Sequence, residues 1–291
     1  MKKRSLTLIL FLTVSLHLMA QQNDFPNLTG PYLGQKPPGE KVEVFAPGII
    51  KYEVHDSPSI SEDLNEILIG SMDEGVIYYV LKNGVWSLSK RGSFPFPKNN
   101  NGMSFSPSGQ KIYYLLWENN DENFYVSEKK NNKWSDIRSL GDEVNSLKTH
   151  WQFSAAQNEN LYFSSGGKIV VSVFKRNKHL KPVHIKLENN EILEGTTPFI
   201  SPDESYMLLS CGTTNDYKTL DIHISYNIGN GKWSLPKNLG IKINSADNID
   251  LCPRISPDGK YLFFISRRPG PDFRVFWVSA SFIEELKPEG L

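Results

Sequence analysis

Residues 255–264 read Ile-Ser-Pro-Asp-Gly-Lys-Tyr-Leu-Phe-Phe, a tight turn followed by a short apolar run. Pro257 restricts φ to the value that the second turn position needs, Asp258 can hydrogen-bond its own backbone, and Gly259 adopts a positive φ without steric cost. The run at 261–264 is typical of a strand buried on both faces. The stretch therefore predicts the end of one strand, a turn and a second strand.

Weaker copies of this pattern occur four times upstream, each around a serine. The five copies are residues 60–68, 105–114, 153–163, 200–208 and 255–264. Their serines lie at positions 61, 106, 154, 201 and 256, which gives intervals of 45, 48, 47 and 55 residues. Periods of about 40 to 50 residues with several short strands per unit are typical of propeller blades.

A second recurrence marks the other end of each unit. Three five-residue segments begin with Asn, have Gly or Asn second and end with Trp-Ser: residues 83–87, 131–135 and 230–234. The third repeat has Asn-Lys-His-Leu at 177–180 instead. Asn-Gly between strands is a strong signal for a two-residue hairpin, because both central residues need a positive φ. We therefore predict an all-β fold, a single five-bladed β-propeller of four-stranded antiparallel blades, with the least regular outer hairpin in repeat three. Six blades are the alternative, if residues 42–54 form more than a closing strand.

The chain divides into three segments. Residues 1–20 combine a basic start with an apolar run and predict a cleavable signal peptide, so that the mature protein is periplasmic or secreted. Residues 21–41 are rich in Pro and Gly and predict an irregular lead-in. Residues 42–291 form the propeller domain, closed by pairing of 42–54 with the strand around 273–278, and residues 281–287 predict a short helix before Pro288.

Composition limits the possible partners. The chain has 32 basic and 32 acidic residues, and this balance argues against a general nucleic-acid or anionic-membrane footprint. No later stretch is apolar enough to form a transmembrane anchor. The only cysteines, Cys211 and Cys252, either pair in an oxidising compartment or remain buried thiols. We expect a monomer without a cofactor.

These motifs resemble a known family. The repeat at 256–264, followed by Ser-Arg at 266–267 and Phe-Trp-Val at 276–278, resembles the Pro-Asp type of WD-repeat-like repeat found in TolB-like proteins. A closer resemblance, to exported single-domain propellers of Bacteroidetes-type bacteria, covers nearly the whole mature chain, including residues 32–39, 45–49, 220–225, 238–240 and 283–288. It implies a periplasmic interaction module without a defined reaction. Repeat one lacks the proline, and repeat three lacks both the proline and the aspartate.

Inner strands of a propeller line its central channel, so the residues before each Ile/Phe-Ser step gather at one channel mouth. The candidate ligand-binding residues there, with Arg267 from the end of a nearby strand, are His55, Asp56, Asn101, His150, Trp151, Glu194, Asp250 and Arg267. A few polar groups beside an aromatic wall are typical of a site for a small polar ligand. The alternative interpretation is that these side chains satisfy one another around a solvated channel, with Arg267 packed on aromatic neighbours.

Two functions stay open. The first is a non-catalytic interaction platform that binds an envelope protein. The second is a carbohydrate or small-ligand binder, or a glycan hydrolase, which would use paired carboxylates among Asp56, Glu194 and Asp250. No motif marks a catalytic residue, and no histidine pair has the spacing of zinc ligands. The repeated Asp63, Asp203 and Asp258 are interpreted as turn residues.

Overall fold

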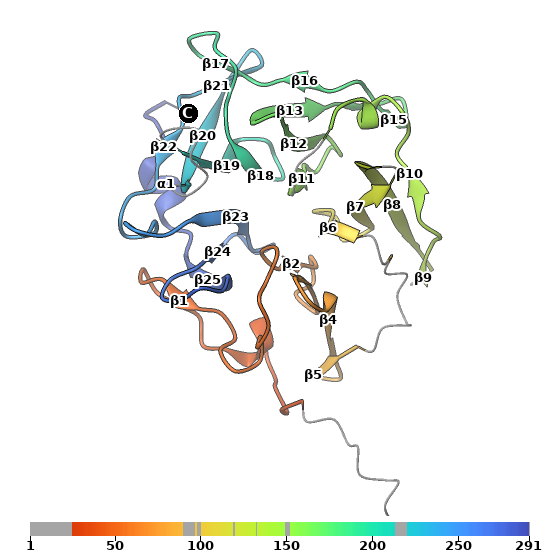
Figure 1. Cartoon of the computed structure of the whole chain (residues 1–291), viewed down its shortest axis with the longest axis vertical. Coiled ribbons are helices and arrows are strands. Elements are labelled where there is room, and N and C mark those ends of the chain that lie inside the picture. Colours follow the sequence, from red (N-terminus) through yellow and green to blue (C-terminus); the bar gives the residue numbers. More distant parts are fainter. Residues whose placement is uncertain are drawn as a thin grey trace, which may run out of the picture.

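The computed structural model describes residues 25–89, 97, 100–118, 120–131, 133–148, 152–212 and 220–290. Five antiparallel sheets surround a central axis, as Figure 1 shows, and almost no helix is present among these residues. The predicted all-β, five-bladed propeller of four-stranded blades is therefore confirmed. The predicted signal peptide lies outside the described residues. Among the described helices, none has the length and apolar character needed to cross a membrane.

Each blade is named here by its position along the chain, and its strands run outward from the axis. Blade 1 contains β2 (Ser59–Ile60), β3 (Glu66–Ser71), β4 (Gly75–Lys82) and β5 (Val85–Leu88). Blade 2 contains β6 (Asn100–Phe105), β7 (Lys111–Glu118), β8 (Asp121–Lys130) and β10 (Arg138–Ser139), with β9 (Lys133–Trp134) also on β8. Blade 3 contains β11 (Phe153–Ala155), β12 (Leu161–Ser165), β13 (Lys168–Ser172) and β16 (Val183–His184).

The remaining blades follow the same order. Blade 4 contains β18 (Thr196–Ile200), β19 (Tyr206–Cys211), β20 (Asp221–Gly229) and β22 (Lys237–Asn238), extended by β21 (Lys232–Trp233) and β17 (Lys186–Leu187). Blade 5 contains β23 (Asp250–Ile255), β24 (Tyr261–Ser266), β25 (Arg274–Ser279) and β1 (Glu43–Val44). The helical turns are η1 (Tyr32–Gly34), η2 (Val144–Ser146) and the predicted C-terminal helix α1 (Phe282–Leu286).

One hydrogen-bond pattern shapes the inner turn in more than one blade. In blade 5, the Ser256 hydroxyl donates to the Asp258 carboxylate at 2.6 Å and accepts from the Tyr261 N–H at 3.0 Å. Burial opposes ionisation of Asp258, but the hydrogen bond from Ser256 helps to bring its pKa below the usual value. The same serine–aspartate bond occurs in blade 1 between Ser61 and Asp63. Both aspartates are thus turn residues, as predicted.

The ring closes by pairing the two ends of the chain. Glu43 and Val44 pair with Trp277 and Phe276 on β25, which confirms the predicted closure. The segment before β1 adds to this seal, because Tyr32 and Leu33 lie in the same buried cluster as Trp277. This burial of the irregular lead-in was not predicted.

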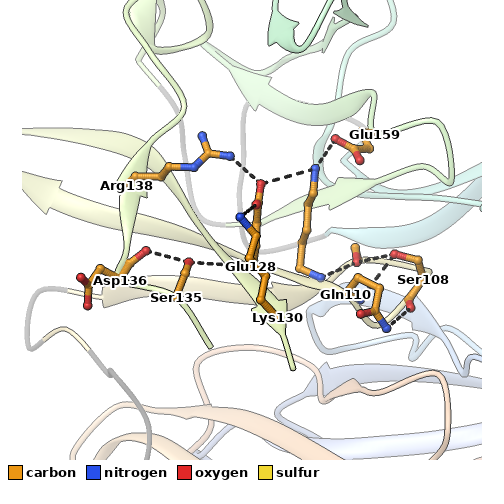
Figure 2. Close-up of polar contacts among 10 residues, drawn as sticks. Ser108, Gln110, Glu128, Lys130, Ser135, Asp136, Arg138 and Glu159 are labelled. Carbon is orange, nitrogen blue, oxygen red and sulfur yellow. Dashed lines mark hydrogen bonds and ion pairs between the residues drawn. The ribbon is translucent and has the colours of Figure 1, made fainter. Parts of the chain in front are cut away.

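Charged side chains link blade 2 with the turn between β11 and β12 of blade 3. Lys111 on β7 forms ion pairs with Glu128 of its own blade at 4.0 Å and with Glu159 of blade 3 at 2.6 Å. Figure 2 shows Arg138 and Lys130 converging on the same Glu128 carboxylate. Exposed pairs of this kind contribute little stability individually. The Lys111–Glu159 pair joins blades 2 and 3.

Blade 3 has an irregular outer part, as predicted, and it encloses a histidine. The hairpin of β14 (Phe174–Lys175) and β15 (Lys178–His179) forms a separate small sheet. His179 is buried between the rings of Tyr113 and Phe174, and its Nδ1 has no partner. Burial, with smaller contributions from the charges of Lys111 and Arg138, lowers the pKa of His179 to about 4, although a hydrogen bond with the Ser172 backbone acts to raise it.

This histidine should make the protein less stable in acid. Because its pKa is lower in the folded than in the unfolded chain, its stabilising contribution is present above about pH 6.5 and is lost as the pH falls towards 4. The loss should reach about 3 kcal/mol at about 1.4 kcal/mol per pH unit. Urea unfolding between pH 4 and 8 should show this slope in the parent chain and not in His179→Phe. An identical slope in both proteins contradicts the assignment, and the exposed His184→Phe is the matched control.

Candidate functional site

The inner strands of all five blades meet at a cavity of about 330 Å³. It lies where these strands end, beside the Ser-Pro-Asp-Gly turns, and Ser59, Ser104, Ser154, Phe199 and Arg254 contribute one wall residue from each blade. Because every blade contributes, the shape of the cavity depends on the closed ring. A concave site with an apolar lining and few polar groups is the usual form of a ligand site.

Arg254 on β23 is the charged centre of this site. Its side chain is only 7% exposed. It donates to the Ser104 hydroxyl at 2.7 Å and to the Asp56 carboxylate at 3.5 Å, and so connects blade 5 with blades 2 and 1. Among the described residues, its Nε finds no hydrogen-bond partner. A buried guanidinium with an unused donor is able to bind an oxygen acceptor.

The Asp56 carboxyl is equally buried, and its environment contains opposing influences. Burial raises its pKa above the usual value, while the nearby charges of Arg254 and His55 and the Ser57 N–H act to lower it. The Ser57 N–H donates to Asp56 Oδ1 at 2.7 Å. The Asp56–Arg254 pair is therefore a buried ion pair with a long contact distance.

A bulge in the inner strand sets the direction of the Arg254 side chain. The register between β23 and β24 shifts between Leu251 and Arg254, and Cys252 has a φ of +57°. The equivalent bulge in β18 gives Thr197 a φ of +49°, and the Thr197 hydroxyl accepts the Cys252 N–H at 3.3 Å. Bulges re-aim side chains and often lie beside functional sites. A positive φ at two non-glycine residues is also locally strained.

Further polar groups on the inner segments lack partners. In the described part of the chain, these are the Ser57 hydroxyl, both amide atoms of Gln152, and the Asn100 side-chain oxygen. Most buried polar side-chain atoms in proteins have a hydrogen-bond partner in protein or ordered water. The channel therefore offers unused donors and acceptors to water or to a ligand.

Two of the predicted site residues lie near the charged centre. Asp56 pairs with Arg254, and the half-buried His55 is next to it in the chain. Asp250 is fully buried at the start of β23, where it holds Arg268 in an ion pair. Glu194 is exposed.

The other predicted residues lie elsewhere or outside the description. Arg267 is exposed, pairs with Glu53 at 3.8 Å and stacks on the Phe273 ring at 4.3 Å, in agreement with the alternative packing interpretation. His150, Trp151 and the side chain of Asn101 lie outside the described residues. Their place at the channel mouth stays a prediction.

Arg254 was missed because only the starts of the inner strands were considered. A signal was present, since an arginine between Pro253 and Ile255 is unusual in an otherwise apolar buried strand. Ser59, Ser104, Gln152 and Phe199 occupy the same place in the other repeats. Comparing the residue that lies two positions before the serine in each repeat would have pointed to the cavity wall.

The cysteines and acidic residues add no further chemistry. Cys211 and Cys252 are both free thiols. Within the described ranges, no group of three or more His, Cys, Asp or Glu side chains is arranged to hold a metal ion.

Comparison with known proteins identifies the fold. No family model and no curated protein matches this chain. Among solved structures, a TolB-like protein of Agrobacterium tumefaciens is 17% identical, with 78% of this chain and 77% of that chain covered and a TM-score of 0.51. TolB from Acinetobacter baumannii is 15% identical, with 76% and 53% covered and a TM-score of 0.49.

A third structure has a printed activity. Xylan β-1,4-xylosidase from Bacillus halodurans is 14% identical, with 79% of this chain and 53% of that chain covered and a TM-score of 0.48. The chain thus spans about half the length of this protein and of the Acinetobacter TolB. At these identities the likeness concerns the fold alone. The match to the Agrobacterium protein confirms the resemblance to TolB-like propellers at the level of the fold.

Proposed function

We propose that this protein is an exported, non-catalytic binding module of the cell envelope, with the channel cavity as its recognition site. The observation that carries the proposal is the five-blade cavity with Arg254 in its wall. Export is supported by the basic and apolar pattern of residues 1–20.

The partner that we propose is a protein. The rim of the cavity includes Pro107, Pro202 and Pro257, each at the second position of a Ser-Pro turn. Pro202 and Pro257 are exposed. Prolines in turns are already rigid, so a partner that contacts them loses little conformational freedom of the rim on binding. A rigid rim that combines these prolines with the exposed Glu62 and Asp258 carboxylates suits the docking of a protein segment.

The alternative, a glycan hydrolase, receives less support. Hydrolysis needs two carboxyl groups facing one glycosidic bond. Asp250 is 0% exposed and is covered by Arg268, whereas Asp56 is paired with Arg254. Glu194 is exposed on the surface. Two of the three carboxylates considered for catalysis are held in separate ion pairs and the third is exposed, which favours binding over catalysis.

Capture from envelope extract tests the proposal. The immobilised mature protein should retain a specific envelope protein, which is then purified and titrated against the propeller. The rim variant Pro202→Glu/Pro257→Glu should bind this partner at least about tenfold more weakly, the size expected when a contact worth about 1.4 kcal/mol is lost. The control Pro271→Glu/Pro288→Glu changes two exposed prolines that do not line the cavity. Equal binding by both variants, or no specific capture, contradicts the proposal.

A further inference from the structure

We infer that the outer edge of blades 3 and 4 binds an anionic lipid surface through an excess of lysine and arginine side chains. The six side chains that carry this charge, called the basic edge here, are Lys175, Arg176, Lys178, Lys181, Lys186 and Lys232. The inference uses the envelope location of the proposed function but a different surface, because none of the six lines the channel cavity.

The charge of the chain balances overall but not in the segment that supplies most of this edge. Residues 160–187 contain six lysine or arginine residues and no aspartate or glutamate. Five of the six are exposed, whereas the sixth, Lys168, is half-buried opposite Glu194. Figure 1 shows β15, β16 and β17 following one another along the outer edge of the ring. The segment therefore places its charge on one part of the circumference.

Two pairs of these cations lie directly opposite one another on neighbouring strands. Lys175 pairs with Lys178 across the β14–β15 hairpin, and Lys186 pairs with Lys232 in the parallel contact of β17 with β21. Like charges at directly opposed positions destabilise a sheet. Within the described ranges, Lys178 is the one member of the basic edge that forms an ion pair, with Glu143 at 2.8 Å. An external anionic surface would relieve this repulsion.

The acidic neighbours of the basic edge do not cancel its charge. Glu143 pairs with Lys178, the Glu188 carboxylate accepts the Leu235 N–H at 3.4 Å, and Glu191 lies a few residues after β17. Six basic side chains against these three carboxylates leave positive charge in excess. Each lysine or arginine close to an anionic bilayer strengthens binding, and this attraction falls off within a Debye length.

Exposed aliphatic side chains lie among these cations. Val173 just before β14, Val183 on β16 and Leu235 just after β21 are 36%, 57% and 51% exposed. β16 is the outermost strand of its sheet, so Val183 lies at the periphery of the ring. Apolar side chains flanked by lysines are typical of surfaces that lie at the boundary between lipid headgroups and acyl chains.

The composition of the basic edge favours lipid over an acidic protein. Protein–protein interfaces are enriched in arginine and aromatic residues and depleted in lysine. Five of the six cations here are lysines, and the exposed apolar residues beside them are valine and leucine. A lysine carries a compact charge on a flexible stem, whereas arginine supplies the rigid fork that matches a protein carboxylate. The basic edge therefore suits the mobile headgroups of a bilayer.

Vesicle flotation of the purified mature protein tests the inference. The protein should float with vesicles of phosphatidylcholine and phosphatidylglycerol and stay unbound with vesicles of phosphatidylcholine alone. Raising the salt concentration to about 1 M, where the screening length is only about 3 Å, should weaken binding at least about tenfold. No binding to the anionic vesicles, or equal binding to both kinds of vesicle, overturns the inference.

Charge reversal at matched positions locates the surface. Lys181→Glu/Lys186→Glu should bind anionic vesicles at least about tenfold more weakly than the parent protein. The control Lys82→Glu/Lys133→Glu makes the same change of net charge at exposed lysines on the outer hairpins of blades 1 and 2, and should bind like the parent. Thermal melts check that all variants are folded. An equal loss in both variants would reveal an effect of net charge alone and overturns the assignment to the basic edge.

A second pair of variants tests the aliphatic contribution. Val183→Ser/Leu235→Ser keeps every charge and should still weaken binding to anionic vesicles, because less apolar surface enters the bilayer boundary. Val85→Ser/Leu88→Ser makes the same change at two exposed positions on β5 of blade 1 and should have no effect. Equal binding by the two variants contradicts insertion of the basic edge.

The outcomes separate this inference from the proposed function. Pro202→Glu/Pro257→Glu, which should lose the protein partner, should bind anionic vesicles like the parent protein. Capture of an acidic protein through the basic edge, without vesicle binding, overturns the lipid inference and leaves the cavity proposal standing. Vesicle binding that depends on the basic edge, with no partner captured through the proline rim, would support the inference and contradict the proposed protein partner.

Discussion

A chain that begins at residue 56, and so lacks the lead-in and residues 42–55, should show no cooperative thermal transition. This deletion removes β1 and with it the outer strand of blade 5. It also removes the buried side chains of Tyr32, Leu33, Phe45 and Val54. Each such side chain contributes about 1.5 to 3 kcal/mol when buried. Losing four is comparable with the whole net stability of a domain, about 5 to 15 kcal/mol.

Two measurements make this prediction specific. A chain beginning at residue 25 keeps every one of these contacts and should melt like the parent protein. Tyr32→Ala should keep a single transition with a loss of about 3 to 5 kcal/mol, typical of a large aromatic core truncation. Calorimetry and near-ultraviolet circular dichroism report the transition. An unchanged melt of the chain that begins at residue 56 would show that the ring closes without β1.

Arg254→Met should destabilise the protein by about 3 to 5 kcal/mol, the usual result of breaking a buried ion pair from one side. The variant leaves the Asp56 carboxylate buried without its arginine, and the Ser104 hydroxyl loses a donor at 2.7 Å. Arg254→Met/Asp56→Asn removes both charges and should recover most of the loss. Urea unfolding of the parent, both single variants and the double variant gives the coupling energy.

The sign of the pH effect provides a second check on this pair. Burial already raises the pKa of Asp56 in the parent protein, and removing Arg254 takes away an influence that lowers it. For an acid whose pKa is raised by folding, stability is greatest below the unfolded pKa and falls as the pH rises through the folded pKa. The cost of Arg254→Met should therefore shrink as the solution is acidified. A cost that is independent of pH, or an equally unstable double variant, would contradict the role of the pair.

The fold was predictable because its signals are local. Ser256, Asp258 and Gly259 specify a turn within a few residues, and Asn83-Gly84 and Asn230-Gly231 have the positive φ values that a two-residue hairpin needs. Repetition of these signals revealed the blades. The closing pair was predictable as well, since the last blade lacked a fourth strand.

The site was less predictable because it depends on contacts between blades. Nothing near Arg254 in the chain indicates that its partners are Asp56 and Ser104, which come from two other blades. Asp250 stays a predicted ligand residue, and its ion pair with Arg268 was not indicated by the sequence. The bulge at Cys252, which aims Arg254, arises from the register of two strands. Side-chain direction in the channel is thus a tertiary property.

The pairing of β1 with β25, at Glu43 and Trp277, also affects the timing of folding. Blade 5 combines β1 with β23, β24 and β25, so the ring stays open until β25 is available. Pairing partners so distant in sequence costs much loop entropy before any gain, and this slows the final step. Until β25 has been synthesised, β1 has no edge to pair with and the core of blade 5 remains unsealed. Synthesis of β25 is therefore the event that permits the ring to close.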